Sequence, residues 1–301
     1  NAVTLALDAG HSFDTIMLDY RKAFDRIPFR HMLAKLEKHG IGGQLLKWIR
    51  NWTEERKQRV ILNGEQSEWI DVTSSVVQGS VLGPLLFTIF INDLDEAIKE
   101  SLNVLISKFA DDSKLGKSIR NEKDRDDLQC AIHDLVKWSK TWGMQLHPDK
   151  CVVLHFGHNN PKYTYNIEGI TIKAVSEARD LGVTITEDLT STKHVNIITK
   201  KAQGVLSQLR RAVTYRDSKV FTGIYKMYVH PILEYNVQAW NPTKISDIKN
   251  IERIQKRALK MITDTGPLGY EDKLKTLKLT TLEDRRRRGD LIEQFKIMND
   301  M

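Results

Sequence analysis

Two adjacent aspartates interrupt a β-prone run and constrain the fold more than any other feature of the sequence. Residues 104–115 fit a strand, a tight turn and a second strand, with Asp111 and Asp112 at the tip. Neighbouring carboxylates repel each other, so holding both at one turn is unfavourable unless a cation lies between them. Taken alone, the stretch fits two interpretations: an Asp-rich surface turn and a metal-binding turn.

Composition places the chain among globular proteins. Its 301 residues, 41% hydrophobic and 28% charged, suffice for one large domain or two. Cys130 and Cys151 are too few for a disulfide framework, which favours a reducing compartment. No apolar run of about 18 residues occurs, so the sequence predicts no membrane-spanning helix. The chain opens on Asn1 rather than Met, and we expect it to be part of a longer polypeptide.

The net charge of +7 is unevenly distributed along the chain. Residues 1–200 carry 26 Lys and Arg against 27 Asp and Glu, whereas residues 201–301 carry 20 against 12. A neutral body with a basic C-terminal third favours a polyanionic partner. The alternative is a set of solvated helix faces, and the basic run 285–288 is open to the same two interpretations.

The N-terminal part alternates between strand and helix patterns. Residues 13–20 predict a buried strand with Asp19 at its end, and residues 29–38 predict a helix. A second helix is expected over residues 44–55, with Leu45, Trp48 and Trp52 on one face toward the core.

A glycine-bearing loop precedes the Asp111-Asp112 pair. Residues 58–62 and 69–72 predict a hairpin joined through Asn63-Gly64. The polar loop 75–84 then leads into an apolar helix expected over residues 85–98. Backbone N–H groups at such a helix start suit a phosphate or nucleotide, and a simple helix entry is the alternative.

The rest of the sequence predicts one long helix, further strands and then a helical module. A long amphipathic helix is expected over residues 122–142, followed by strands at 150–156, 170–173 and 181–185. Helical periodicity then dominates, over 193–215, 217–229, 245–263 and 280–298. The sequence therefore predicts an α+β fold with an antiparallel sheet and helices on one face. We divide it into residues 1–157, a hairpin region 158–190 and a helical module 191–301.

The order of these elements is that of a nucleotide polymerase palm. Two-metal phosphoryl transfer needs carboxylates from adjacent strands that hold two divalent cations about 3.5–4 Å apart. Asp19 and Asp111 lie at predicted strand ends far apart in the sequence, as carboxylates brought together across a sheet would.

Over nearly all its length the chain resembles the reverse transcriptase domain of non-LTR retrotransposons, LINE-type and jockey-like. The blocks occur in the family's order: residues 18–25 (LDYRKAFD), 78–87 (QGSVLGPLLF) with 91–94 (INDL), 109–112 (FADD), 138–156, and 179–183 (RDLGV). The helical tail is similar too, at residues 228–235, 240–242, 251–255 and 282–286. Five blocks in the right order make the resemblance specific. By this resemblance, residues 1–157 would be the palm with a partial fingers insertion, 158–190 the primer-grip hairpin region and 191–301 a thumb-like helical module.

The resemblance implies a role for each matching residue. Asp19, Asp111 and Asp112 would be the metal carboxylates, and Lys150 would donate a proton to pyrophosphate or neutralise it. The residues expected to bind substrate are Tyr20, Phe24, Gln78 and Gly79. Among these, the Phe24 ring would exclude a 2′-hydroxyl, whereas Asp25 is expected to be a structural partner rather than a ligand.

By this resemblance the chain is an RNA-directed DNA polymerase, a nucleotidyltransferase that uses two Mg²⁺ ions, with Mn²⁺ as an alternative. Its expected partners are an RNA template, a DNA primer and deoxynucleoside triphosphates, within a retroelement ribonucleoprotein of the nucleus and cytoplasm. His147 departs from the asparagine usual before the lysine. No fingers motifs precede Asn1, so we expect an N-terminally truncated copy. The alternatives are an inactive or domesticated nucleic-acid-binding remnant and a group II intron maturase.

Overall fold

The computed structural model describes residues 2–299, which form two compact units divided between Ser176 and Glu177. The boundary lies within the segment 158–190 that the sequence analysis set apart. The hairpin at residues 177–186 therefore belongs to the same unit as the C-terminal helices. Within the described residues, no helix combines the length and apolar character needed to cross a membrane.

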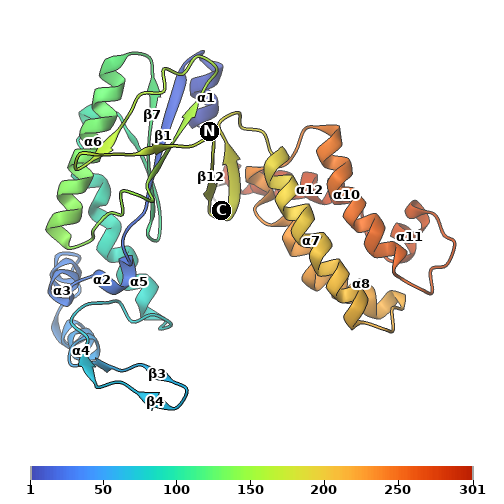
Figure 1. Ribbon diagram of the computed structural model, residues 1–301, viewed down its shortest axis with the longest axis horizontal. Helices are drawn as coiled ribbons and strands as arrows, with labels where there is room; N and C mark the ends of the chain where they lie inside the picture. Colours follow the sequence, from blue (N-terminus) through green and yellow to red (C-terminus); the bar gives the residue numbers. More distant parts are fainter. Residues whose placement is uncertain (1, 300–301) are drawn as a thin grey trace. The chain divides into compact units, whose positions relative to one another are not determined.

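A five-stranded sheet organises the first unit (Figure 1), in the order β11-β8-β1-β7-β6. From edge to edge its strands are β11 (Lys173–Ala174), β8 (Val152–Phe156), β1 (Ser12–Leu18), β7 (Asp112–Ile119) and β6 (Leu105–Phe109). Neighbours pair antiparallel, except that β11 runs parallel to β8. The central strand β1 thus lies between two strands that come much later in the sequence.

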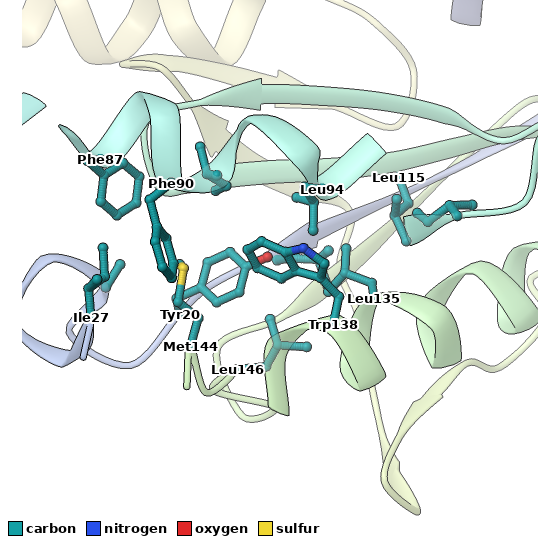
Figure 2. Close-up of a cluster of buried hydrophobic side chains, with 14 of the residues drawn as sticks. Tyr20, Ile27, Phe87, Phe90, Leu94, Leu115, Leu135, Trp138, Met144 and Leu146 are labelled. Atoms are coloured by element: carbon teal, nitrogen blue, oxygen red, sulfur yellow. The ribbon is translucent and has the colours of Figure 1, made fainter. Parts of the chain in front are cut away.

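Alternation along β1 sends every second side chain into the core. Ile16, Leu18 and Tyr20 are buried, whereas Met17 and Asp19 on the opposite face are partly exposed. Figure 2 shows the Tyr20 ring among Trp138 and the other core side chains. This side of the sheet is covered by helices, and the α+β palm fold expected from the sequence is confirmed.

Two of the helices of the first unit have the limits that the hydrophobic pattern predicts. The helices are α1 (Ala2–Asp8), α2 (Ala23–Arg26), α3 (Phe29–Lys38), α4 (Gly43–Thr53), α5 (Leu82–Ile91) and α6 (Glu122–Trp142), with 3-10 helices η1 (Asn92–Ala97) and η2 (Glu100–Leu102). The predicted limits of α3 and α6 are confirmed. Asn121 caps α6 by accepting from the Asp124 N–H, and Gly143 ends it with φ 76°.

Two helix predictions were wrong in detail. The apolar helix predicted over 85–98 starts earlier, at Leu82, and gives way to η1 after Ile91. The core face of α4 is formed by Leu46 and Ile49, and Trp52 packs against the same core as predicted, whereas Leu45 and Trp48 are 56% and 52% exposed. Trp48 and Trp52 instead stack on each other, with ring centroids 6.0 Å apart, as residues one turn apart can.

Short strands complete the first unit. The predicted hairpin is a ladder of β2 (Lys57–Gln58) with β5 (Ile70–Asp71) and β3 (Ile61–Leu62) with β4 (Glu65–Gln66). Its tip is the expected Asn63-Gly64 turn, where both residues have positive φ. Two further strands, β9 (Asn166–Ile167) and β10 (Ile170–Thr171), form a small hairpin.

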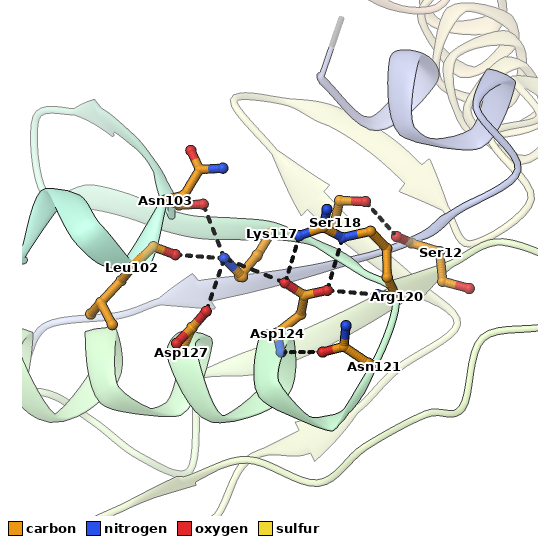
Figure 3. A network of polar contacts seen from close by, with 9 residues as sticks. All are labelled: Ser12, Leu102, Asn103, Lys117, Ser118, Arg120, Asn121, Asp124 and Asp127. Carbon is orange, nitrogen blue, oxygen red and sulfur yellow. Dashed lines mark hydrogen bonds and ion pairs between the residues drawn. The ribbon is translucent and has the colours of Figure 1, made fainter.

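Buried charges join the sheet to α6. Figure 3 shows Lys117 of β7, 5% exposed, with its Nζ 3.7 Å from an Asp124 oxygen and 3.4 Å from Asp127.

On the core face of β1, the fully buried Asp14 accepts hydrogen bonds from Tyr165 Oη at 2.6 Å and Asn160 Nδ2 at 2.8 Å, and its Oδ1 lies 2.8 Å from His155 Nδ1. Burial and the adjacent Asp14 raise the pKa of Tyr165. These contacts satisfy charges that would otherwise be costly to bury.

The second unit is helical after an initial hairpin, as the periodicity predicts. The hairpin pairs β12 (Glu177–Asp180) with β13 (Val183–Thr186). The helices are α7 (Thr192–Ala212), α8 (Ser218–Tyr228), α9 (His230–Glu234), α10 (Ile245–Lys260), α11 (Tyr270–Thr276) and α12 (Leu282–Met298), with a 3-10 turn η3 (Val237–Ala239). Two buried clusters hold them together: one includes Leu206, Tyr225 and Ile254, and the other includes Phe221 of α8 and Leu274 of α11.

One buried ion pair connects α3 to η1. Lys35 is 1% exposed, and its Nζ lies 2.6 Å from Asp93 Oδ1 and 3.9–4.4 Å from the ring centroids of Phe90, Trp138 and Trp142. Trp138 Nε1 donates to the same Asp93 oxygen at 3.1 Å. Burial lowers the pKa of Lys35 to about 8, although Asp93 opposes the shift.

Replacing Lys35 by Met should lower the free energy of unfolding by about 3–5 kcal/mol, because Asp93 is left buried without its cation. The double variant Lys35→Met/Asp93→Asn should recover part of this loss. Urea denaturation followed by circular dichroism measures both. Lys38→Met, at an exposed side chain of the same helix, is the control and should change stability by less than about 0.5 kcal/mol. A double variant as unstable as the sum of the two single changes would contradict a coupled pair.

Candidate active site

The register of the central strands brings the predicted carboxylates to one end of the sheet. Leu18 of β1 pairs with Ser113 of β7, so the next residues, Asp19 and Asp112, are opposite each other. Phe109 of β6 pairs with Asp112, which leaves Asp111 in the two-residue turn between β6 and β7. The three aspartates therefore meet where three strands end, although 92 residues separate Asp19 from Asp111.

The turn that carries Asp111 has an uncommon backbone. Ala110 adopts φ 51°, the left-handed region that two-residue hairpins require but that few residues other than Gly, Asn and Asp adopt. Such strain persists only where the surrounding strands enforce it, and it is often found at functional sites. The tight turn keeps Asp111 directly beside the strand end.

The loop after α6 places Lys150 against the same strand end. His147 N donates to Asp19 O at 2.8 Å, and Asp19 N donates to Cys151 Sγ at 3.4 Å. These bonds hold the turn 147–151, and Lys150 Nζ lies 3.6 Å from Asp19 Oδ2. Because His147 contributes a backbone N–H here, its replacement of the usual asparagine leaves this contact intact.

The donor set suits a hard divalent cation, although its side chains are not gathered. Asp19 Oδ2 is buried and accepts no hydrogen bond, as expected of a carboxylate oxygen available to an ion. Across residues 2–299, however, no three His, Cys, Asp or Glu side chains are grouped closely enough to hold a metal. The expected close cluster is therefore not formed by the side chains. Carboxylates without a cation between them repel one another, which is consistent with this spread.

The Gln78-Gly79 loop is fixed to the segment after β1. Gln78 is exposed, and its Nε2 donates to Asp25 Oδ1 at 2.7 Å. Val76 N donates to Phe24 O at 2.8 Å. Gly79 has φ 78° and open space around its Cα. Asp25 is thus a partner of the loop, as the resemblance implied.

The two aromatic residues after β1 differ in their surroundings. Phe24 is partly buried, and its ring stacks on Phe87 of α5 with centroids 4.2 Å apart. Tyr20 is only 5% exposed, and burial raises the pKa of its phenol. Tyr20 follows Leu18 by two residues, so its side chain points into the same core. A buried side chain leaves only the Tyr20 backbone for substrate binding, and its assignment to that role stays a prediction.

Gly83 contributes to this site and was missed from the sequence. A Cβ atom here would lie 2.6 Å from Val77 O and 3.0 Å from Ser80 Oγ, so only glycine allows the loop to fold against α5. Ser80 Oγ accepts from Gly83 N at 2.9 Å and donates to Val77 O at 2.7 Å. The pattern Gln-Gly-x-x-x-Gly was the available signal.

This fold and this arrangement of residues define a polymerase palm, and the comparisons agree. The model for reverse transcriptase (RNA-dependent DNA polymerase) matches residues 9–185, more than half of the chain. The chain belongs to the reverse transcriptase family.

The particular relatives are polymerases of mobile elements. The probable RNA-directed DNA polymerase from transposon BS of Drosophila melanogaster is 27% identical over 284 residues, which cover 86% of this chain and 30% of that protein. The RNA-directed DNA polymerase from mobile element jockey of Drosophila funebris is 28% identical over 272 residues, with 86% and 29% covered. The predicted resemblance to non-LTR elements is confirmed. The chain spans less than a third of the length of these relatives.

One solved structure aligns with the chain at low sequence identity. Apo telomerase from Candida tropicalis aligns with 94% of this chain and 49% of that chain, at 13% identity and a TM-score of 0.48.

Replacing Gly83 by Ala should destabilise the first unit by about 1–3 kcal/mol, because the new methyl group meets the Val77 carbonyl. Thermal melting measures the effect. The control is Gly204→Ala in α7, where a Cβ meets nothing within 4 Å. There the change should stabilise by up to about 1 kcal/mol. Equal effects at both positions would show that the loop accommodates a side chain.

Proposed function

We propose that the chain is the polymerase core of an RNA-directed DNA polymerase of a non-LTR retroelement. The observation that supports this most is the pairing of β1 with β7, which puts Asp19 opposite Asp112, next to the Asp111 turn. Lys150 Nζ, 3.6 Å from Asp19 Oδ2, adds the cation needed near a leaving pyrophosphate. That all four side chains are retained at one sheet end argues against a remnant without catalytic function.

In this proposal Asp19, Asp111 and Asp112 hold two Mg²⁺ ions, for which Mn²⁺ can substitute. When bound, the ions lower the pKa of the primer 3′-hydroxyl and neutralise charge on the triphosphate. The 3′-oxygen forms a bond to the α-phosphorus as the bond to pyrophosphate breaks. Lys150 gives a proton to the departing pyrophosphate, a contribution typically worth about 10²–10⁴-fold.

The loop and the ring beside it are proposed to select the nucleotide. Gln78 and Gly79 are exposed, and a glycine without neighbours lets a substrate approach the backbone. Phe24 presents the partly exposed edge of a ring that Phe87 holds in place. A rigid ring there would leave no room for a 2′-hydroxyl.

The proposed partners are an RNA template, a DNA primer and deoxynucleoside triphosphates. The basic second unit would contact the template–primer backbone. A retroelement ribonucleoprotein of the nucleus and cytoplasm is the proposed setting, since such a polymerase must meet both its RNA and chromosomal DNA.

Replacing Asp111 by Asn should abolish primer extension, because an amide of nearly the same shape cannot supply the negative charge for the ions. Extension of a labelled DNA primer on an RNA template, with Mg²⁺ and with Mn²⁺, measures this. Asp126→Asn, on the exposed face of α6, is the control and should retain activity. A fully active Asp111→Asn would remove this carboxylate from the site, whereas wild-type protein without activity in either metal would contradict the proposed function of this chain.

Replacing Phe24 by Val should raise the use of ribonucleotides relative to deoxyribonucleotides, because the smaller side chain makes room for a 2′-hydroxyl. Single-nucleotide incorporation with both sugars, beside a melting curve, tests this. If Phe24 serves only to anchor the turn on Phe87, the change should instead destabilise the fold. Phe24→Ala would then cost about 3–5 kcal/mol. Unchanged sugar preference in a stable variant would exclude Phe24 from the pocket.

A further inference from the structure

The helices α7 and α10 of the second unit run parallel, with matching N-terminal ends. Thr192 Oγ1 donates to Asp247 Oδ2 at 2.7 Å, and eleven residues further along α7, Gln203 Oε1 accepts from Arg257 Nη1 at 2.6 Å. The offset stays near 54 residues, so the two helices start together and lie side by side, as drawn in Figure 1, and α7 continues past the end of α10. The C-terminal ends of both helices therefore lie on one side of the unit.

A cationic cavity of about 550 Å³ opens at these C-terminal ends. Its charged lining residues are Arg210 of α7, Arg216 of the following loop, and Arg257 and Lys260 of α10. No carboxylate lines it, and within residues 2–299 none of the four cations forms an ion pair. The nearest acidic residues in sequence, Asp217 and Asp264, are occupied with the N–H groups of Val220 and Ser218.

The backbone carbonyl of Arg216 is held by hydrogen bonds, whereas the Nε donor of its side chain is not used. Thr263 N and Thr263 Oγ1 both donate to Arg216 O, at 2.9 and 3.0 Å. Its Nε is buried and has no hydrogen-bond partner in the part of the chain that the structure describes. An unsatisfied buried donor is unfavourable, and an anionic ligand would satisfy it.

The helix macrodipole explains only part of this arrangement. Cations in the last turn of α7 and of α10 are stabilising because they face the negative end of each helix. Arg216 belongs to neither helix, yet it lines the same cavity. Gln203 Oε1 accepts a hydrogen bond from the Arg257 guanidinium, and both residues line the cavity.

From these observations we infer that the cavity binds consecutive phosphates of a nucleic-acid strand. Three guanidinium groups offer the forked donors that phosphate oxygens accept. No aromatic side chain lines the cavity, so it lacks the stacking surface that a free nucleotide or an unpaired base would need. Such backbone contacts bind without reading sequence.

The cavity lies far from the β12–β13 hairpin along the same helix. The 21 residues of α7 span about 31 Å, close to one turn of a nucleic-acid duplex. The inference thus rests on the proposed function for the identity of the strand, and it adds a backbone contact about one turn away from the hairpin that resembles a primer grip.

The test is the affinity of the full chain for fluorescent single-stranded RNA and for an RNA–DNA duplex, by anisotropy over a range of KCl concentrations. Arg210→Gln/Arg257→Gln should weaken binding about tenfold and reduce the slope of log K against log salt by about 1.4 for a single strand. The matched control is Lys200→Gln/Lys249→Gln, two exposed cations on the same helices outside the cavity. Equal losses in both pairs, or an unchanged slope in the cavity pair, would overturn the inference.

Two further arms make the result independent of folding and of catalysis. Lys260→Glu reverses an exposed charge at the cavity without disturbing the core, and it should weaken binding. Lys249→Glu reverses an exposed charge outside the cavity, and it should leave binding unchanged. Inorganic pyrophosphate at constant ionic strength should compete only weakly; saturable pyrophosphate binding that these variants abolish would assign the cavity to free phosphates instead. Asp111→Asn should bind RNA normally, so binding and extension fail separately.

Discussion

The antiparallel pairing of β1 with β7 and β8 is the constraint on which the active site depends. The seven residues of β1 set the register of the strands on both sides. Side-chain alternation at its end points Leu18 and Tyr20 into the core and Asp19 to the opposite face. A shift of one residue in either pairing would move Asp19 into the core and Tyr20 onto the site. The buried side chains therefore hold the catalytic register in place.

Buried charges strengthen this register where apolar packing alone would permit alternatives. Asp14 on β1 lies opposite His155 on β8 and binds it, which is possible in only one pairing of the two strands. Lys117 likewise ties β7 to the start of α6. A buried charge that loses its partner is strongly destabilising, so misregistered pairings are penalised. The polar groups inside the sheet thus contribute specificity as well as stability.

The sequence predicted correctly those elements whose ends are set by a local signal, such as a helix cap or a turn. Asn121 and Gly143 delimit α6, and the Asn63-Gly64 turn sets its hairpin. The face of α4 was not predictable, because both Leu45-Trp48-Trp52 and Leu46-Ile49-Thr53 have helical spacing and only tertiary contacts choose between them. The burial of Tyr20 was predictable from strand alternation, whereas carboxylate positions depend on rotamers that no sequence pattern specifies.

The division of charge between the units has a physical reason. Two lysines of the first unit, Lys35 and Lys117, are buried and internally paired, so they cannot contact a polyanion. Lys150 stands near Asp19, and further cations there would compete with divalent ions for the carboxylates. Cations that grip a phosphate backbone are better placed on another unit. Within residues 2–299 the arginines that line the cavity form no ion pair, so their charge is available to a strand.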